Sequence, residues 1–181
     1  MTLNDIIVSA LLELDRGHDA QTLDLWRDKL THFANDAAAD LAYAIKPTRT
    51  QTAPITDGAI DTTQLERRCV KVISVKADGR ELEFARLNTG KVAIEDARGA
   101  VQAEICYVFL PRELSSATDV PELPEVCHAL IVTYAVGRER AAGDVAVQRG
   151  GNIYFQMYES GKRRLRAHLG APGDFALTNR W

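Results

Sequence analysis

The spacing of apolar residues changes twice along this chain, and this change most limits the folds that it can adopt. Over residues 2–46, apolar side chains recur every three to four positions, which is the period of an amphipathic helix. Over residues 68–110 they alternate with polar ones, as in a half-buried strand, and over 121–169 the helical period returns. A block of strands between two helical blocks predicts an α+β fold with an inserted β-module.

The N-terminal block predicts a pair of helices. Thr2 can cap the first helix, with Asp5 completing a weak capping box, and Gly17 lies near its end. The second helix should begin at residue 19 or 21 and stop at Pro47, because proline lacks the N–H that a helix interior needs.

The C-terminal block predicts a second pair, beginning at Pro121 or Pro124 and turning at Gly143–Asp144. About seven residues to either side of that turn lie Gly137 and Gly150–Gly151, so we expect these glycines to face each other and let the helices approach closely. The alternative is a break at Gly150–Gly151 with a loop before it, because a helical glycine costs about 1 kcal/mol relative to alanine.

The central block predicts a four-stranded antiparallel β-meander with one buried face. Asp78–Gly79 is a strong hairpin signal, because a type I′ turn needs positive φ at both central residues. Two further turns are expected at residues 88–90 and 96–99. The expected strands are 68–77, 80–87, 91–95 and 100–110.

These periods divide the chain into four parts. The two helical pairs should pack as one four-helix bundle, and an extended C-terminal tail should follow. The stretch 47–66 is polar, rich in threonine and without a sustained period, so we expect an extended connection with at most one short strand near 55–60. The parts are an N-terminal helical pair (1–46), a linker with the β-module (47–120), a C-terminal helical pair (121–169) and a tail (170–181).

The tail, GAPGDFALTNRW, has no period but carries three large apolar side chains, those of Phe175, Leu177 and Trp181. A segment too short to form its own core rarely exposes such residues to water. We therefore expect it to dock on a partner and to become ordered on binding. The alternative is that it packs back on its own domain.

No catalytic, cofactor-binding or metal site is predicted. The four histidines form no zinc-type motif, and no nucleophile elbow or phosphate loop is present. Cys127 and His128 are adjacent, but neighbours on a helix point about 100° apart and so do not face each other. We expect a protein that is not an enzyme and that holds no cofactor.

One basic cluster lies at the end of the last expected helix, in the run GKRRLRAH (residues 161–168). It could simply complement the negative end of the helix dipole. Otherwise it would contact an acidic protein surface or DNA phosphates. The net charge of −3 argues against nucleic-acid binding over the whole surface. The cluster consists of Lys162, Arg163, Arg164 and Arg166.

The sequence also predicts a protein made in the cytoplasm, with no membrane partner. No apolar run approaches the ~20 residues of a membrane-spanning helix. The apolar N-terminal stretch lacks the basic flank of a signal peptide and is interrupted by Asp5 and Glu13. The three cysteines lack the spacing of a disulfide framework or a zinc site, which is typical of reduced thiols.

Three stretches of the chain resemble the head-to-tail adaptor (connector or neck) proteins of tailed bacteriophages. They are the opening MTLNDIIVSALLEL, the tryptophan helix LDLWRDKLTHFANDAAADL and the segment VPELPEVCHALIVTYAVGRERAAGD. The last is the most similar, with a proline–acid start, an apolar helix and a short turn into a helix that bears tyrosines. The resemblance covers most of the chain in architecture and rests on patterns.

The resemblance implies a structural role in the neck of the virion and no chemistry. Such proteins form a ring, typically of twelve subunits, which lies below the portal, extends the DNA channel without sequence-specific DNA binding and offers a platform to tail or neck proteins. Portal docking would fall on the tail of the chain, through Phe175, Leu177, Arg180 and Trp181. There are three alternatives. They are another neck or tail-completion (terminator) protein, a small DNA-binding regulatory module that uses residues 161–168, and an enzyme of unfamiliar type.

Overall fold

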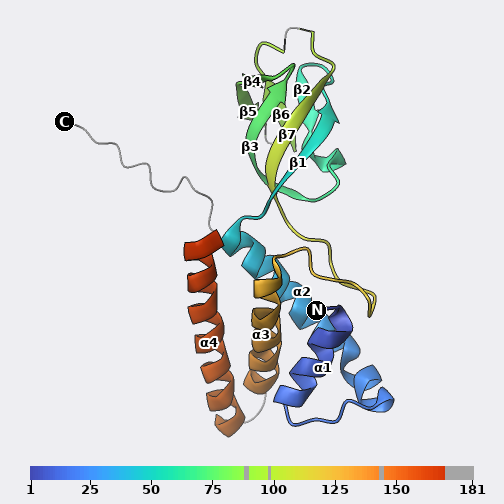
Figure 1. Ribbon diagram of the computed structural model, residues 1–181, viewed down its shortest axis with the longest axis vertical. Coiled ribbons are helices and arrows are strands. Elements are labelled where there is room, and N and C mark those ends of the chain that lie inside the picture. Colours follow the sequence, from blue (N-terminus) through green and yellow to red (C-terminus); the bar gives the residue numbers. More distant parts are fainter. Residues whose placement is uncertain (88–89, 98, 143–144, 170–181) are drawn as a thin grey trace, which may run out of the picture. The chain divides into compact units, whose positions relative to one another are not determined.

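The computed structural model describes residues 1–87, 90–97, 99–142 and 145–169, without the side chains of 145–151. These residues form two compact units. The first unit is made of two segments, residues 1–45 and the residues from 112 onward, and the second comprises residues 46–111. The first is helical and the second contains a four-stranded antiparallel sheet, so the predicted α+β class is confirmed (Figure 1).

The helical unit is organised around its third helix. That helix, α3, packs against each of the other three helices and lies between α1 and α4 in Figure 1, whereas the backbones of α1 and α4 come close at very few of the described residues. The helices are α1 (Leu3–Glu13), α2 (Ala20–Ile45), α3 (His128–Ala141) and α4 (Val145–Leu169), and a 3-10 turn, η2 (Glu125–Cys127), leads into α3. Because α3 has neighbours on three sides, its apolar residues lie all around it, and Ile131, Ala135 and Val136 are fully buried.

Local capping signals set the starts of the first two helices. The Thr2 N–H donates to the Asp5 carboxylate (2.8 Å), and the Asp5 N–H donates to the Thr2 hydroxyl (3.2 Å), which completes the predicted capping box. These hydrogen bonds lower the pKa of Asp5. Asp19 caps α2 in the same way, accepting from the backbone N–H (3.1 Å) and the hydroxyl (2.7 Å) of Thr22.

The predicted hairpin of the last two helices is present, and α4 is continuous through Gly150–Gly151. The expected pairing of glycines was wrong: Gly137 faces Tyr154, whose Cβ would lie 3.3 Å from a Cβ on the glycine, and Gly161 faces Leu130. The pairing is thus centred about two residues later than the glycine at Gly143–Asp144 predicts. Those two residues lie outside the described part of the chain.

Gly161→Leu should lower the free energy of unfolding of the helical unit by about 2 kcal/mol, because the new side chain must displace Leu130. Gly161→Ala is the control. Its single methyl meets the movable end of Leu130, and alanine's better helix propensity returns about 1 kcal/mol. Denaturant unfolding followed by circular dichroism measures both. A leucine variant as stable as the alanine variant would contradict close packing here.

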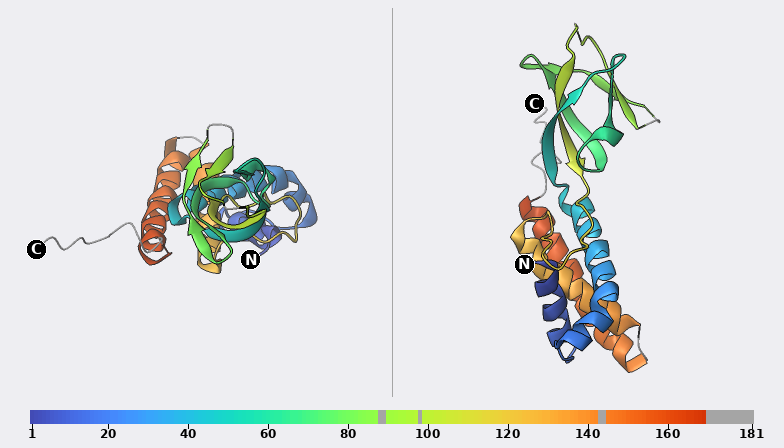
Figure 2. Two further views of the ribbon diagram at one scale, coloured as in Figure 1. Left: turned by 90° about the horizontal axis from the view of Figure 1, so that it is seen from above. Right: turned by 90° about the vertical axis from the view of Figure 1, so that its right-hand side faces the viewer.

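The β-unit forms two sheets instead of the predicted single meander. Within the described residues, the strand order is β1-β7-β3-β4 in a four-stranded antiparallel sheet and β2-β6-β5 in a three-stranded one; the strands can be followed in Figures 1 and 2. The strands are β1 (Thr48–Pro54), β2 (Ala59–Asp61), β3 (Cys69–Ala77), β4 (Arg80–Leu82), β5 (Phe84–Arg86), β6 (Lys91–Ile94) and β7 (Gln102–Phe109), with a 3-10 turn, η1 (Thr62–Gln64), after β2.

The departure from a meander has a physical reason. A single sheet buries its apolar face only against a second layer, and the second sheet supplies that layer. The strand expected at 80–87 therefore divides at Glu83 into β4 and β5, which belong to different sheets, and β7 pairs with β3 and β1 instead of β6. The shared core includes Val75, Ile105 and Tyr107 from the larger sheet and Ile60, Val92 and Ile94 from the smaller one. The Asp78–Gly79 turn is confirmed, with φ of 51° and 74°.

The segment predicted as a polar connection contains a full strand. β1 pairs with β7 along its whole length, from Thr48 opposite Val108 to Pro54 opposite Gln102. Its half-buried positions are polar, so no hydrophobic alternation marks it. Gln51, for example, is satisfied because its Oε1 accepts from the backbone N–H of Glu66 (3.0 Å) and from the Tyr107 hydroxyl (3.3 Å).

Residues 112–120, which the sequence grouped with the β-module, belong to the helical unit. The Leu3 N–H donates to the Asp119 carbonyl (2.7 Å) at the start of α1. The Asn35 amide on α2 donates to the Leu114 carbonyl (3.0 Å) and accepts from the Leu114 N–H (2.8 Å). These contacts lie more than seventy residues apart along the chain, so no local pattern could have assigned the loop.

Candidate interaction surfaces

The predicted basic cluster is divided between an internal contact and solvent. Lys162 Nζ lies 2.8 Å from Asp40 Oδ2 on α2 and 2.7 Å from Glu159 Oε1. Arg163 Nε donates to the Glu159 carbonyl within α4 (3.3 Å), and the side chains of Arg163, Arg164 and Arg166 are exposed. One member of the cluster therefore holds α4 to α2, and three arginines remain on the surface.

Asp40 is the centre of this internal contact. Its Oδ2 also accepts a 2.6 Å hydrogen bond from the hydroxyl of Tyr158, whose side chain is 1% exposed. Burial and the bond to Asp40 raise the pKa of Tyr158. Burial alone would lower the pKa of Lys162, but its hydrogen bonds to Asp40 and Glu159 raise it. The lysine thus stays charged and the tyrosine neutral, which suits a structural clamp between two helices.

Cys127 and His128 do not form a catalytic couple. His128 Nδ1 lies 3.0 Å from the Met1 amine, and Nε2 lies 3.3 Å from the Leu123 carbonyl. Because the ammonium group donates to Nδ1, Nε2 carries the hydrogen and donates to the carbonyl. Burial, followed by the charge of the amine, lowers the pKa of His128, and burial raises the pKa of the Cys127 thiol. A nucleophilic cysteine needs the opposite shift.

No metal-binding group of three His, Cys, Asp or Glu side chains occurs in the part of the chain that the structure describes. Its cysteines, Cys69, Cys106 and Cys127, are free thiols. None of the described helices is long and apolar enough to cross a lipid bilayer.

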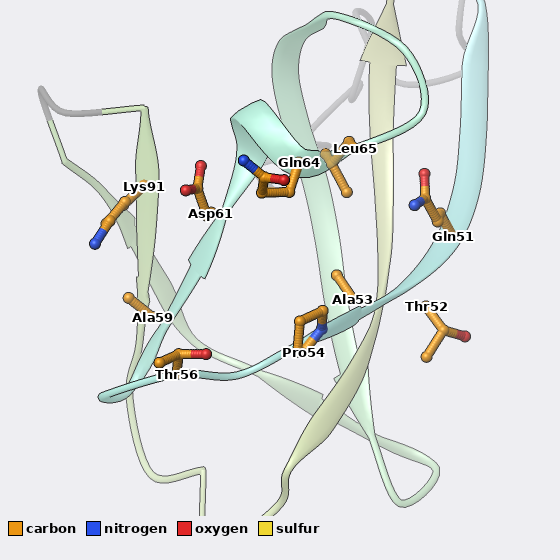
Figure 3. A pocket seen from close by; sticks show the side chains of 10 residues that line it. All are labelled: Gln51, Thr52, Ala53, Pro54, Thr56, Ala59, Asp61, Gln64, Leu65 and Lys91. Atoms are coloured by element: carbon orange, nitrogen blue, oxygen red, sulfur yellow. The ribbon is translucent and has the colours of Figure 1, made fainter.

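The β-unit has a hollow of about 320 Å³ beside β1, lined by both polar and apolar residues (Figure 3). Figure 3 shows Lys91 and Asp61 on one side of it and Gln51 and Thr52 on the other. The Asp61 carboxylate is already used, since it accepts from the hydroxyl (2.6 Å) and N–H (2.9 Å) of Thr63, and these bonds lower its pKa. The hollow therefore offers amide and hydroxyl contacts.

The helical unit has a more apolar groove, which lies on α3 between α1 and α4 and encloses about 280 Å³. We call it the α3 groove. Sequence reasoning predicted no groove here, because the spacing of apolar residues along α3 does not show which of its sides lacks a neighbouring helix. A helix that is apolar on all sides was the available signal. The lining residues are Met1, Ser9, Glu13, Ala129, Val132, Thr133, Val136, Tyr154 and Met157.

Residues 1–176 match the family model described as SU10 adaptor protein. The chain belongs to the SU10 adaptor family. This family match spans both units and confirms the resemblance to phage head-to-tail adaptors that the sequence suggested. A comparison with curated proteins finds no match.

As an SU10 adaptor, the chain is a structural component of a phage virion and belongs to a family of adaptors rather than of enzymes. An adaptor works through contacts with other virion proteins, so its surfaces matter more than its hollows. The residues predicted to dock on the portal, Phe175, Leu177, Arg180 and Trp181, lie outside the described residues.

Proposed function

We propose that this adaptor forms a ring of twelve copies below the portal in the neck of a tailed phage, after synthesis in the host cytoplasm. There it extends the DNA channel and provides the platform for tail or neck proteins. The observation that carries the proposal is the family match over residues 1–176. The net charge of −3 supports it, because a strongly basic channel lining would bind phosphates and hold the DNA.

Two surfaces serve the partners in this proposal. The tail, residues 170–181, docks on the portal through Phe175, Leu177, Arg180 and Trp181. The exposed arginines of α4 contact an acidic protein surface or DNA phosphates without reading sequence. Lys162 is not part of that contact, because it pairs with Asp40 and Glu159.

Deletion of residues 170–181 should abolish binding to the portal and leave the helical and β-units folded. Mixing the purified chain with portal rings, followed by size-exclusion chromatography with light scattering and electron microscopy, measures the complex. The full chain should join the portal as a ring, and the truncated chain should elute apart from it. Unchanged circular dichroism of the truncated chain is the control. A chain that stays monomeric beside portal rings would refute the ring proposal.

The second candidate function is a small DNA-binding module, which the exposed arginines support. Substitution of Arg163, Arg164 and Arg166 with alanine distinguishes the two. If the isolated chain binds duplex DNA tightly with a steep salt dependence, and the triple variant does not, the DNA-binding module is favoured. If neither binds DNA and portal binding persists, the adaptor ring is favoured. A third candidate, a terminator, would bind a completed tail instead of the portal.

A further inference from the structure

The α3 groove is open along one side of the helical unit. Val132 and Val136 of α3 form its apolar floor, and Met157 on α4 is 57% exposed at its wall. Ile153, one helical turn from Met157, is also exposed. At one end the groove is closed by the Tyr154 hydroxyl, which donates to Glu13 Oε2 (3.2 Å). No described residue covers it, so the apolar side chain of Met157 at its wall faces water, and an exposed apolar surface beside a groove is typical of a binding site.

We propose that residues 170–181 of the same chain fill the α3 groove in the free protein. The three large apolar side chains of this segment suit it to the task. Phe175, Leu177 and Trp181 are separated by even numbers of residues, so in an extended chain all three point to the same side. One face of the segment can therefore be laid on the apolar floor while the other stays in water.

The segment has the reach to do so. It begins where α4 ends, at Leu169, and α4 itself forms a wall of the groove. From Leu169 back to Tyr154, at the closed end, is about 22 Å of helix at 1.5 Å per residue. Twelve residues of extended chain cover up to about 40 Å, which leaves length for a turn through Gly170–Gly173.

Charge fixes the direction. Glu13 is the charged side chain that lines the groove, and it lies at the closed end beside Tyr154. The segment contains one basic residue, Arg180, close to its end. Running back along α4, it brings Arg180 toward Glu13. The one acidic residue of the segment, Asp174, then stays near the basic end of α4. Arg164 lies there, seven residues after Met157 and therefore on the same side of the helix as Met157.

The attachment to α4 favours the chain's own segment over that of a second copy. A short tether gives an effective concentration in the mM range, which exceeds ordinary protein concentrations. The consequence is a masked docking tail, since the same apolar side chains cannot occupy the groove and the portal together. This inference does not depend on the ring, because it concerns the free chain.

Fluorescence of Trp181 tests the proposal in the full chain. Trp26, the other tryptophan, is replaced in a Trp26→Phe background, which leaves Trp181 as the only reporter. We expect acrylamide to quench Trp181 several-fold less than it quenches the free peptide of residues 170–181. Met157→Arg should raise quenching to the level of the peptide, and Ile153→Arg provides a second test at an exposed position. Leu25→Arg, at an exposed apolar position of α2 outside the groove, should change nothing.

Charge exchange provides an independent readout. Arg180→Glu should raise quenching, and combination with Glu13→Arg should restore protection. Trp181 quenched in the full chain as fast as in the peptide would overturn the proposal. Protection that disappears on dilution would also overturn it, because a second copy would then be the occupant. Portal binding is measured separately. Met157→Arg frees the tail and should keep that binding. If Trp181 is protected in the original chain and exposed in the Met157→Arg variant, but this variant fails to bind the portal, only the proposed function is refuted.

Discussion

Asp40→Ala is expected to lower the free energy of unfolding of the helical unit by about 3 kcal/mol. The Tyr158 hydroxyl is buried and donates to Asp40 Oδ2 at 2.6 Å, so the substitution leaves it without its acceptor. An unpaired buried donor costs about 1–3 kcal/mol. The ion pair with Lys162 adds less than its 2.8 Å distance suggests, because the Asp40 side chain is 45% exposed and water screens it.

Two variants make this prediction specific. Asp36→Ala removes a partly exposed carboxylate one turn earlier on α2, whose contacts with His32 and Arg138 are 3.6 Å long, and should cost less than about 1 kcal/mol. Tyr158→Phe removes the donor instead of the acceptor. The double variant with Asp40→Ala should cost about 1–2 kcal/mol less than the sum of the single ones. Urea unfolding of the helical signal measures all of them, and equal losses at Asp36 and Asp40 would show that the clamp is not stabilising.

Acid should destabilise the helical unit through His128, beginning as the pH falls below about 6.5, the ordinary pKa of histidine. Burial and then the Met1 amine lower the pKa of His128 in the folded chain. The unfolded chain therefore takes up a proton in a range where the folded chain does not. The contribution of His128 to the free energy of unfolding is fully present above about pH 6.5. As the pH decreases below that value, this contribution decreases by at most about 1.4 kcal/mol per pH unit, until the pH reaches the lowered pKa of the folded chain.

His128→Gln should remove this part of the pH dependence, at some loss of stability at neutral pH. The glutamine does not titrate. The unfolding free energy of the variant should therefore change less between neutral and mildly acidic pH than that of the original chain. His32→Gln is the control, because His32 is 68% exposed and lies on the surface beside Asp36. Thermal unfolding across this pH range gives the comparison. The same acid loss in the His128→Gln and original chains would place the sensitive group elsewhere.

Features that depend on a few neighbouring residues could be predicted from the sequence. The Thr2–Asp5 capping box, the stop at Pro47 and the Asp78–Gly79 turn each follow from local hydrogen bonding or allowed backbone angles. The number and approximate length of the helices followed from the 3.6-residue period for the same reason. β1 could not be predicted in this way, because the partners that satisfy its half-buried polar side chains, such as Glu66 for Gln51, come from elsewhere in the β-unit.

The sequence by itself determined the helix–strand–helix order of this adaptor and the basic cluster at the end of its last helix. The tertiary structure decided which strands pair and that Lys162 is held by Asp40, 122 residues away in sequence. It also decided that α1 and α4 stand apart over α3 and leave the α3 groove open. The physical reason is range: caps and turns are formed within a few residues, whereas pairing, clamps and grooves depend on contacts whose partners only the packed chain brings together.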